Sequence, residues 1–71
     1  MSEQTETLAD ALPKEMARVR DVLGHYREIG PPGMFGAAMI ERDLRAADRA
    51  VMSGDVVAML RSLKTLQGIT G

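Results

Sequence analysis

The chain has 71 residues, a net charge of −1 at neutral pH and no cysteine. A chain this short can form only one domain, because two halves would each be too small to bury a core. The lack of cysteine excludes disulfides and thiolate–metal sites, so packed apolar side chains must supply nearly all of the stability.

Residues 1–7 are polar and acidic and have no hydrophobic periodicity, which is typical of a disordered tail. They lack the basic and apolar regions of a signal peptide. The longest apolar stretch, residues 34–40, is less than half of the roughly 20 residues that cross a bilayer. We therefore expect a cytoplasmic protein with no membrane span, made of a disordered acidic tail at 1–7 and a single helical domain at 8–71.

A first helix is predicted over about residues 12–29. Its apolar residues recur every three or four positions, as on one face of a helix. They are Leu8, Leu12, Met16, Val19, Leu23 and Tyr26, with Val22 and Ile29 widening the stripe. Pro13 suits the first turn of a helix and favours a break at Leu12. Gly30 and the two prolines after it end the helix.

The linker 30–36, Gly-Pro-Pro-Gly-Met-Phe-Gly, is unusual because a solvent-facing turn does not need two large apolar residues. We predict that the prolines stiffen this corner and that Met34 or Phe35 plugs the end of the core. Phe35 is the preferred plug, since the glycines at 33 and 36 let the backbone turn its ring inward and an exposed Met-Phe pair invites aggregation. The alternative is that Phe35 is an exposed anchor for another chain.

Two further helices are predicted, over about residues 36–52 and 55–67. The second helix has a main apolar face and a shallower stripe beside it; the face comprises Ile40, Leu44, Ala47 and Val51, and the stripe Met39, Ala46 and Ala50. The third helix contributes Val56, Met59, Leu60, Leu63 and Leu66. Gly54 suits a left-handed helix end and Asp55 the next N-cap. So short a connection predicts an antiparallel hairpin, and the fold class is an all-α, three-helix domain.

Residues 46–60 resemble the inter-helix turn of a tetratricopeptide repeat. Small residues precede a Gly-Asp turn at 54–55, and alanine and apolar residues follow it. No period of about 34 residues recurs elsewhere in the chain. The resemblance therefore implies a tight hairpin with close alanine contacts and not a solenoid.

A longer resemblance covers three segments of the chain. Leu-Pro-Lys-Glu-Met at 12–16, the run from Gly30 to Glu41 and Ser-Gly-Asp at 53–55 are similar to small helical proteins of unknown function encoded in phages and prophages. This resemblance implies a bacterial cytoplasmic setting, in which short proteins dock on a larger host or phage protein. It carries no catalytic residues.

The charge pattern bears on nucleic-acid binding. After residue 10 the chain has nine basic and seven acidic residues, with one Tyr, one Phe and no Trp for base stacking. An alternative function is a nucleic-acid-associated regulator that uses Arg42, Arg45 and Arg49 on one side of the second helix. Acids interleave with these arginines and cancel phosphate contacts, so we do not expect nucleic acid as the partner.

A third class of function is a small metal-binding or enzymatic protein. His25 shares a helical face with Asp21 and Glu28, but one imidazole with two exposed carboxylates lacks the ligand closure of a zinc site. We favour a surface of salt bridges for this trio. About 60 ordered residues leave little room for a ligand pocket, and no nucleophile stands beside a base. We therefore predict no catalysis, no cofactor and no metal.

The leading hypothesis is a small non-catalytic protein–protein interaction module. It would act by docking on a larger protein, by self-association as a homo-oligomer, or by both. The motivation is the second stripe of the second helix, which is better explained if another helix covers it. The predicted interaction surface consists of Met34, Phe35, Met39, Ala46 and Ala50.

Overall fold

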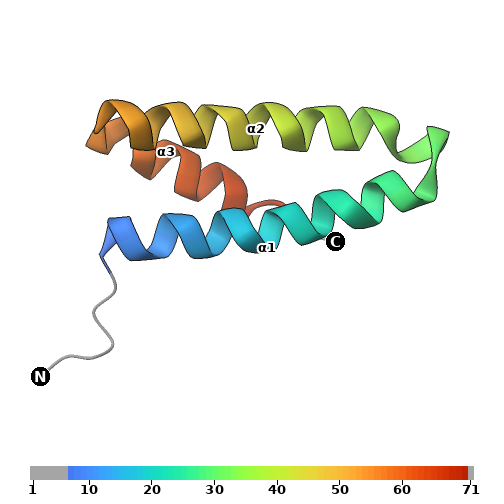
Figure 1. Cartoon of the computed structure of the whole chain (residues 1–71), viewed down its shortest axis with the longest axis horizontal. Coiled ribbons are helices and arrows are strands. Elements are labelled where there is room, and N and C mark those ends of the chain that lie inside the picture. The colour runs from blue at the N-terminus through green and yellow to red at the C-terminus, as the bar shows by residue number, and fades with distance from the viewer. Residues whose placement is uncertain (1–6, 71) are drawn as a thin grey trace, which may run out of the picture.

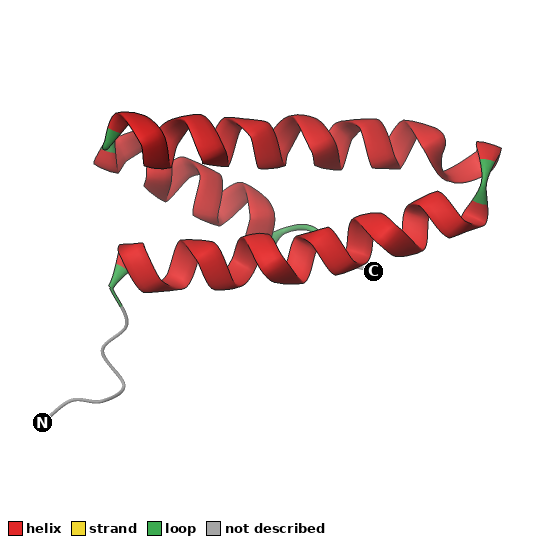
Figure 2. Cartoon of the chain, viewed as in Figure 1, coloured by secondary structure: helices red, strands yellow, loops and turns green. Residues whose placement is uncertain are grey.

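A computed structural model describes residues 7–70 of the chain (Figure 1). Its elements are helix α1 (Leu8–Ile29), a 3-10 turn η1 (Pro31–Gly33), helix α2 (Met34–Ser53) and helix α3 (Val56–Gln67). Within residues 7–70 there is no strand (Figure 2). The prediction of an all-α, three-helix domain is confirmed. The expected disordered tail lies outside the described residues, except for Thr7.

Helix α1 begins four residues before the expected start. Thr7 is its N-cap, and the Thr7 hydroxyl accepts a hydrogen bond of 3.2 Å from the backbone N–H of Asp10. The expected break at Leu12 does not occur, and Pro13 lies inside the helix. A proline there removes one helical hydrogen bond. The N-cap and the complete burial of Leu12 offset this cost.

The corner between α1 and α2 is built on glycine. Gly30 ends α1 with a φ of 86° and a ψ of −148°, a combination that side-chain-bearing residues rarely adopt. The chain then makes the 3-10 turn, and α2 starts at Met34, two residues before the expected start. Met34 and Phe35 therefore belong to the first turn of α2.

The turn between α2 and α3 follows the prediction closely. Gly54 has left-handed backbone angles (φ 69°, ψ 21°), and its N–H donates to the carbonyl of Val51 at 3.2 Å. Asp55 is the N-cap of α3, and its carboxylate accepts a hydrogen bond of 3.1 Å from the N–H of Ala58. The prediction of an antiparallel hairpin is confirmed.

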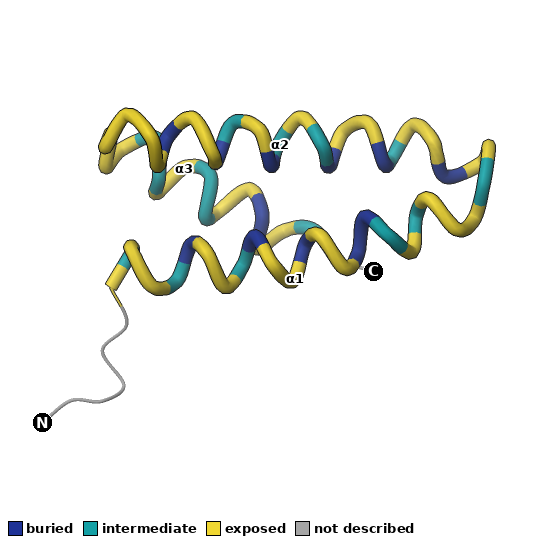
Figure 3. Tube along the Cα trace, viewed as in Figure 1, coloured by how far each residue is buried: buried dark blue, intermediate teal, exposed yellow. Residues whose placement is uncertain are grey.

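The core lies where the three helices face one another (Figure 3). Its buried residues are Leu12, Met16, Val19, Val22, Leu23, Ala37, Ile40, Leu44, Ala47 and Leu66. Leu44 is buried as predicted. Val51, which was expected on the same face, is 44% exposed, and Ile29 is also exposed. The buried face of α2 instead ends on Ala50, because near the hairpin the buried side of α2 is the side that packs against α3.

Helix α3 packs against both α1 and α2 but is much shorter than either. Its 12 residues span about 18 Å, whereas the 20 residues of α2 span about 30 Å. Starting from the hairpin turn, α3 runs back toward the middle of α1 (Figure 1). It therefore covers the hairpin half of the α1–α2 pair and stops before the corner half.

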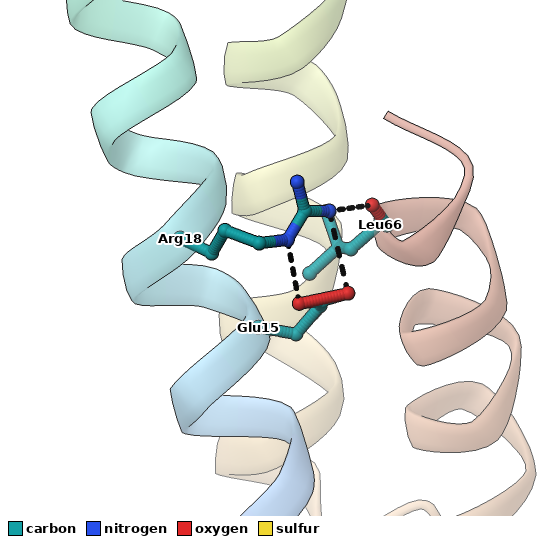
Figure 4. A network of polar contacts seen from close by, with 3 residues as sticks. All are labelled: Glu15, Arg18 and Leu66. Carbon is teal, nitrogen blue, oxygen red and sulfur yellow. Dashed lines mark hydrogen bonds and ion pairs between the residues drawn. The ribbon is translucent and has the colours of Figure 1, made fainter. Parts of the chain in front are cut away.

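Two contacts hold the end of α3 against α1 (Figure 4). Leu66 is completely buried, and the Arg18 guanidinium donates a hydrogen bond of 2.8 Å from Nη2 to its backbone carbonyl. The Nε of Arg18 donates to the Glu15 carboxylate at 2.8 Å. This hydrogen bond raises the pKa of Arg18. The guanidinium thus stays charged where the carbonyls of α3 end.

Candidate interaction surfaces

Large apolar side chains are exposed at both ends of the elongated bundle. We call the first group, at the α1–α2 corner, the corner surface; it consists of Ile29, Met34, Phe35 and Met39. We call the second group, around the α2–α3 turn, the hairpin surface; it consists of Val51, Met52, Val56, Val57 and Leu60. Exposed apolar groups that gather in this way are typical of contact surfaces.

The preferred prediction for Phe35, a plug of the core, is wrong. Its ring is 78% exposed, and Met34 beside it is exposed as well. The reason is helical geometry: with α2 starting at Met34, Ala37 and Ile40 face the core, and Phe35, two residues before Ala37, points away from it. The alternative, an exposed Phe35, is the one that the structure bears out.

Tyr26 occupies the place that was predicted for Phe35. The ring of Tyr26 is half-buried, packs against the core and lies over Gly36. A Cβ added at Gly36 would stand 2.5 Å from Cε2 of Tyr26. Gly33 is equally constrained, because an added Cβ would collide with the backbone carbonyl oxygen of Tyr26. The two glycines thus serve close packing of Tyr26 and not the inward turn of Phe35.

An open depression of about 270 Å³ lies beside the corner surface, in line with the end of α3. Its lining comes from α1, α2 and the segment after α3: Tyr26, Gly36, Met39, Ile40, Asp43, Gly68, Ile69 and Thr70. The volume is slightly below the range of roughly 300–1,000 Å³ found for small-molecule pockets. An apolar cavity of roughly 150 Å³ is sufficient for benzene, so the depression is large enough for one aromatic ring.

The predicted surface on the second stripe of α2 is only partly free. Met39 is exposed at the rim of the depression, and Ala46 is half-buried. Ala50 is only 4% exposed, so its assignment to an interaction surface is corrected. Another helix was expected to cover this stripe. Near the hairpin, that helix is α3 of the same chain and not a partner.

The hairpin surface was missed in the sequence because Val56 and Leu60 were assigned to the packed face of the third helix and Val57 was assigned to no face. Val56 and Val57 are adjacent, and neighbours on a helix point about 100° apart. With Met59, Leu63 and Leu66 turned toward the core, Val56, Val57 and Leu60 remain outside. The apolar residues of 56–66 span a wider arc around the helix axis than one packed face can bury. That width is the sequence signal for the hairpin surface.

The residues of the two alternative functions all lie on the outside. Arg42, Arg45 and Arg49 are exposed, and the Nε of Arg42 lies 3.6 Å from Oδ1 of Asp43. On α1, His25 is exposed together with the carboxylates at positions 21 and 28. Among residues 7–70, no three His, Cys, Asp or Glu side chains come together in a group that could hold a metal ion. None of the helices in this part of the chain has the length and apolar character that a membrane crossing requires.

The fold and its surfaces define a small three-helix domain with an apolar group at each end. No protein-family model matches the sequence, and no similar curated protein or solved structure was found. The function is therefore argued from the surfaces themselves.

Proposed function

We propose that this protein is a small, non-catalytic protein–protein interaction module, in line with its resemblance to small phage-encoded proteins. It acts in the bacterial cytoplasm by docking on a larger protein, by associating with itself, or by both. The observation that carries the proposal is the grouping of nine exposed large apolar side chains into the corner and hairpin surfaces. Keeping such groups in water is unfavourable, so they are better explained as contacts than as free surface.

The separation of the exposed apolar side chains from the core supports this proposal. The core is complete without the nine side chains, because α1, α2 and α3 already bury a continuous apolar cluster. The exposed residues thus add little to the stability of the single chain. Side chains of this kind gain their burial when a second surface covers them.

The alternative of a nucleic-acid-associated regulator has weaker support. The three exposed arginines share α2 with Glu41, Asp43 and Asp48, and the ion pair between Arg42 and Asp43 competes directly with a phosphate. Tight DNA binding that persists at moderate salt in a gel-shift assay would favour this alternative over ours.

Site-specific photo-crosslinking in a bacterial host tests the proposal. We would place p-benzoylphenylalanine at Phe35 in the corner surface, at Val57 in the hairpin surface, or at Arg49 on the charged side of α2 as a matched exposed control. We expect discrete protein crosslinks from position 35, from position 57 or from both, and none from position 49. Equal crosslinking at all three positions, or at position 49 alone, would contradict the proposal.

A further inference from the structure

The corner half of the α1–α2 pair lacks the third helix that covers the hairpin half. The difference in length between α2 and α3 leaves about 12 Å of the pair without a covering helix on this side, where the segment 68–70 lies instead. In this half lies the depression, which is lined by the apolar side chains of Tyr26, Met39, Ile40 and Ile69 together with Asp43 and Thr70. The missing cover therefore has a defined size: about two helical turns, or an equivalent apolar surface.

The corner surface and the depression beside it together supply a protruding side chain and a hollow. Phe35 and Met39 are four residues apart on α2, so they lie on the same side of the helix, one turn from each other. Met39 lines the depression, while Phe35 is exposed to solvent and precedes Gly36, which also lines it. A two-fold contact joins the same surface of two molecules, so it requires a knob and a matching hollow within one patch. The corner surface meets this requirement.

The charges around the corner also favour a second copy. Residues 29–40 contain no charged side chain, in a chain in which 27% of the residues are charged. Of the charges that flank this run, Arg27 pairs with Glu41, and Arg42 pairs with Asp43. Glu28 is exposed, but it is two residues from Tyr26 and so points to the opposite side of α1 from the ring that lines the depression. Two copies that meet at the depression therefore bring mainly uncharged surface together, which limits the repulsion between like charges that a surface meeting itself usually incurs.

We propose that a second copy of this chain covers the corner surface about a two-fold axis, with the Phe35 ring of each copy inserted in the depression of the other. The depression, at about 270 Å³, has the room for this ring. The corner halves of α1 and α2 from the two copies then form a four-helix arrangement, with one α3 at each outer end. This inference rests on the proposed function and assigns self-association to the corner, which leaves the hairpin surface for a larger partner.

A lipid surface is the main competing occupant. Exposed Met34 and Phe35 at a proline-rich tip are side chains that enter membranes, but membrane-binding tips add a basic flank that attracts anionic lipid. Here the flanking arginines at positions 27 and 42 are each paired with an acid. With both arginines paired and Glu28 exposed beside them, the corner has no basic flank, which suits a copy of itself better than an anionic bilayer.

Sedimentation equilibrium of the purified full chain tests the proposal through Phe35→Ala. We expect the wild-type protein to be in a concentration-dependent monomer–dimer equilibrium, and Phe35→Ala to raise the dimer dissociation constant at least ~30-fold, as for a central interface residue. The matched control is Met52→Ala, because Met52 is 87% exposed but belongs to the hairpin surface. The control should change the constant less than ~3-fold. Melting of the diluted monomer should be unchanged in both variants, since neither side chain is in the core.

Crosslinking between copies tests the arrangement. In a mixture of isotopically light and heavy chains, p-benzoylphenylalanine at position 35 should react with the partner's C-terminal segment or with the helix around its tyrosine, both of which line the depression. Crosslinks to the hairpin surface of the second copy would instead indicate a head-to-tail contact and overturn the two-fold arrangement.

Three further results would also overturn the inference. They are a wild-type chain that stays monomeric at high micromolar concentration, a dimer that Phe35→Ala leaves intact, and Phe35-dependent binding of the monomer to vesicles of phosphatidylcholine and phosphatidylglycerol. A monomer that still crosslinks to a host protein from position 57 would refute only this inference and leave the proposed function standing. Absence of both dimer and host crosslinks would refute both.

Discussion

Leu66 is the most deeply buried side chain of α3, beside the partly buried Met59 and Leu63, and this gives a prediction for Leu66→Ala. Leu66 is the only residue of α3 that is buried, at 0% exposure. Truncation of a buried leucine to alanine costs about 2–5 kcal/mol, because both the transfer energy and the packing around the side chain are lost. A domain of this size has a total unfolding free energy of roughly 4–11 kcal/mol. We therefore expect Leu66→Ala to remove a large share of the stability.

Leu60→Ala is the matched control for this prediction. It makes the same chemical change in the same helix, but Leu60 is 47% exposed, so the expected loss is below about 1 kcal/mol. Leu66→Ala leaves the backbone carbonyl that Arg18 binds, so the measured difference reports the side chain alone. The assay is urea unfolding followed by circular dichroism at low protein concentration, where association through the hairpin surface does not contribute. Equal losses for the two variants would refute the packing of α3 described above.

Two further predictions concern Leu44 in the core, with Val51 as its exposed control, and Gly36 beside Tyr26. In the same urea assay, Leu44→Ala should lower the free energy of unfolding by about 2–5 kcal/mol and Val51→Ala by less than about 1 kcal/mol, because only Leu44 is buried. Similar losses for the two variants would mean that the buried face of α2 is misplaced. Gly36→Ala should cost about 1–3 kcal/mol and change the fluorescence of Tyr26, the single tyrosine, because the added Cβ collides with its ring. A fully stable variant with unchanged tyrosine emission would contradict this contact.

The elements that were predicted correctly from the sequence are those with local causes. Gly30 and Gly54 end their helices because backbone angles with positive φ favour glycine, and Asp55 caps α3 by a hydrogen bond three residues away. Leu44 was placed correctly because it lies at the centre of its stripe, where an error of one turn at either helix end has no effect. These signals act within one or two helical turns and need no knowledge of the neighbouring helices.

The residues that were misplaced depend on the neighbouring helices. Val51 fits the 3.6-residue period as well as Leu44 does, but the buried face of α2 turns toward α3 before Val51 is reached, and Ala50 is buried instead. Phe35 and Tyr26 were both available to fill the corner, and the choice depends on how closely α1 and α2 approach at Gly33 and Gly36. The spacing of apolar residues predicts that a helix has a buried face. It does not predict the path of the neighbouring helix that covers this face.

The length of α3 connects these observations with the proposed interaction. A third helix as long as α2 would run on past Leu66, cover the depression and bury Met39 at its rim. Gly68 ends α3 early, and of residues 69 and 70 after it only Ile69 packs against the core. The chain thus folds with a complete core at one end and an apolar hollow at the other. Because an exposed phenyl ring lies one helical turn from Met39 in the lining of that hollow, the proposed contact needs no side chain beyond those of a second copy.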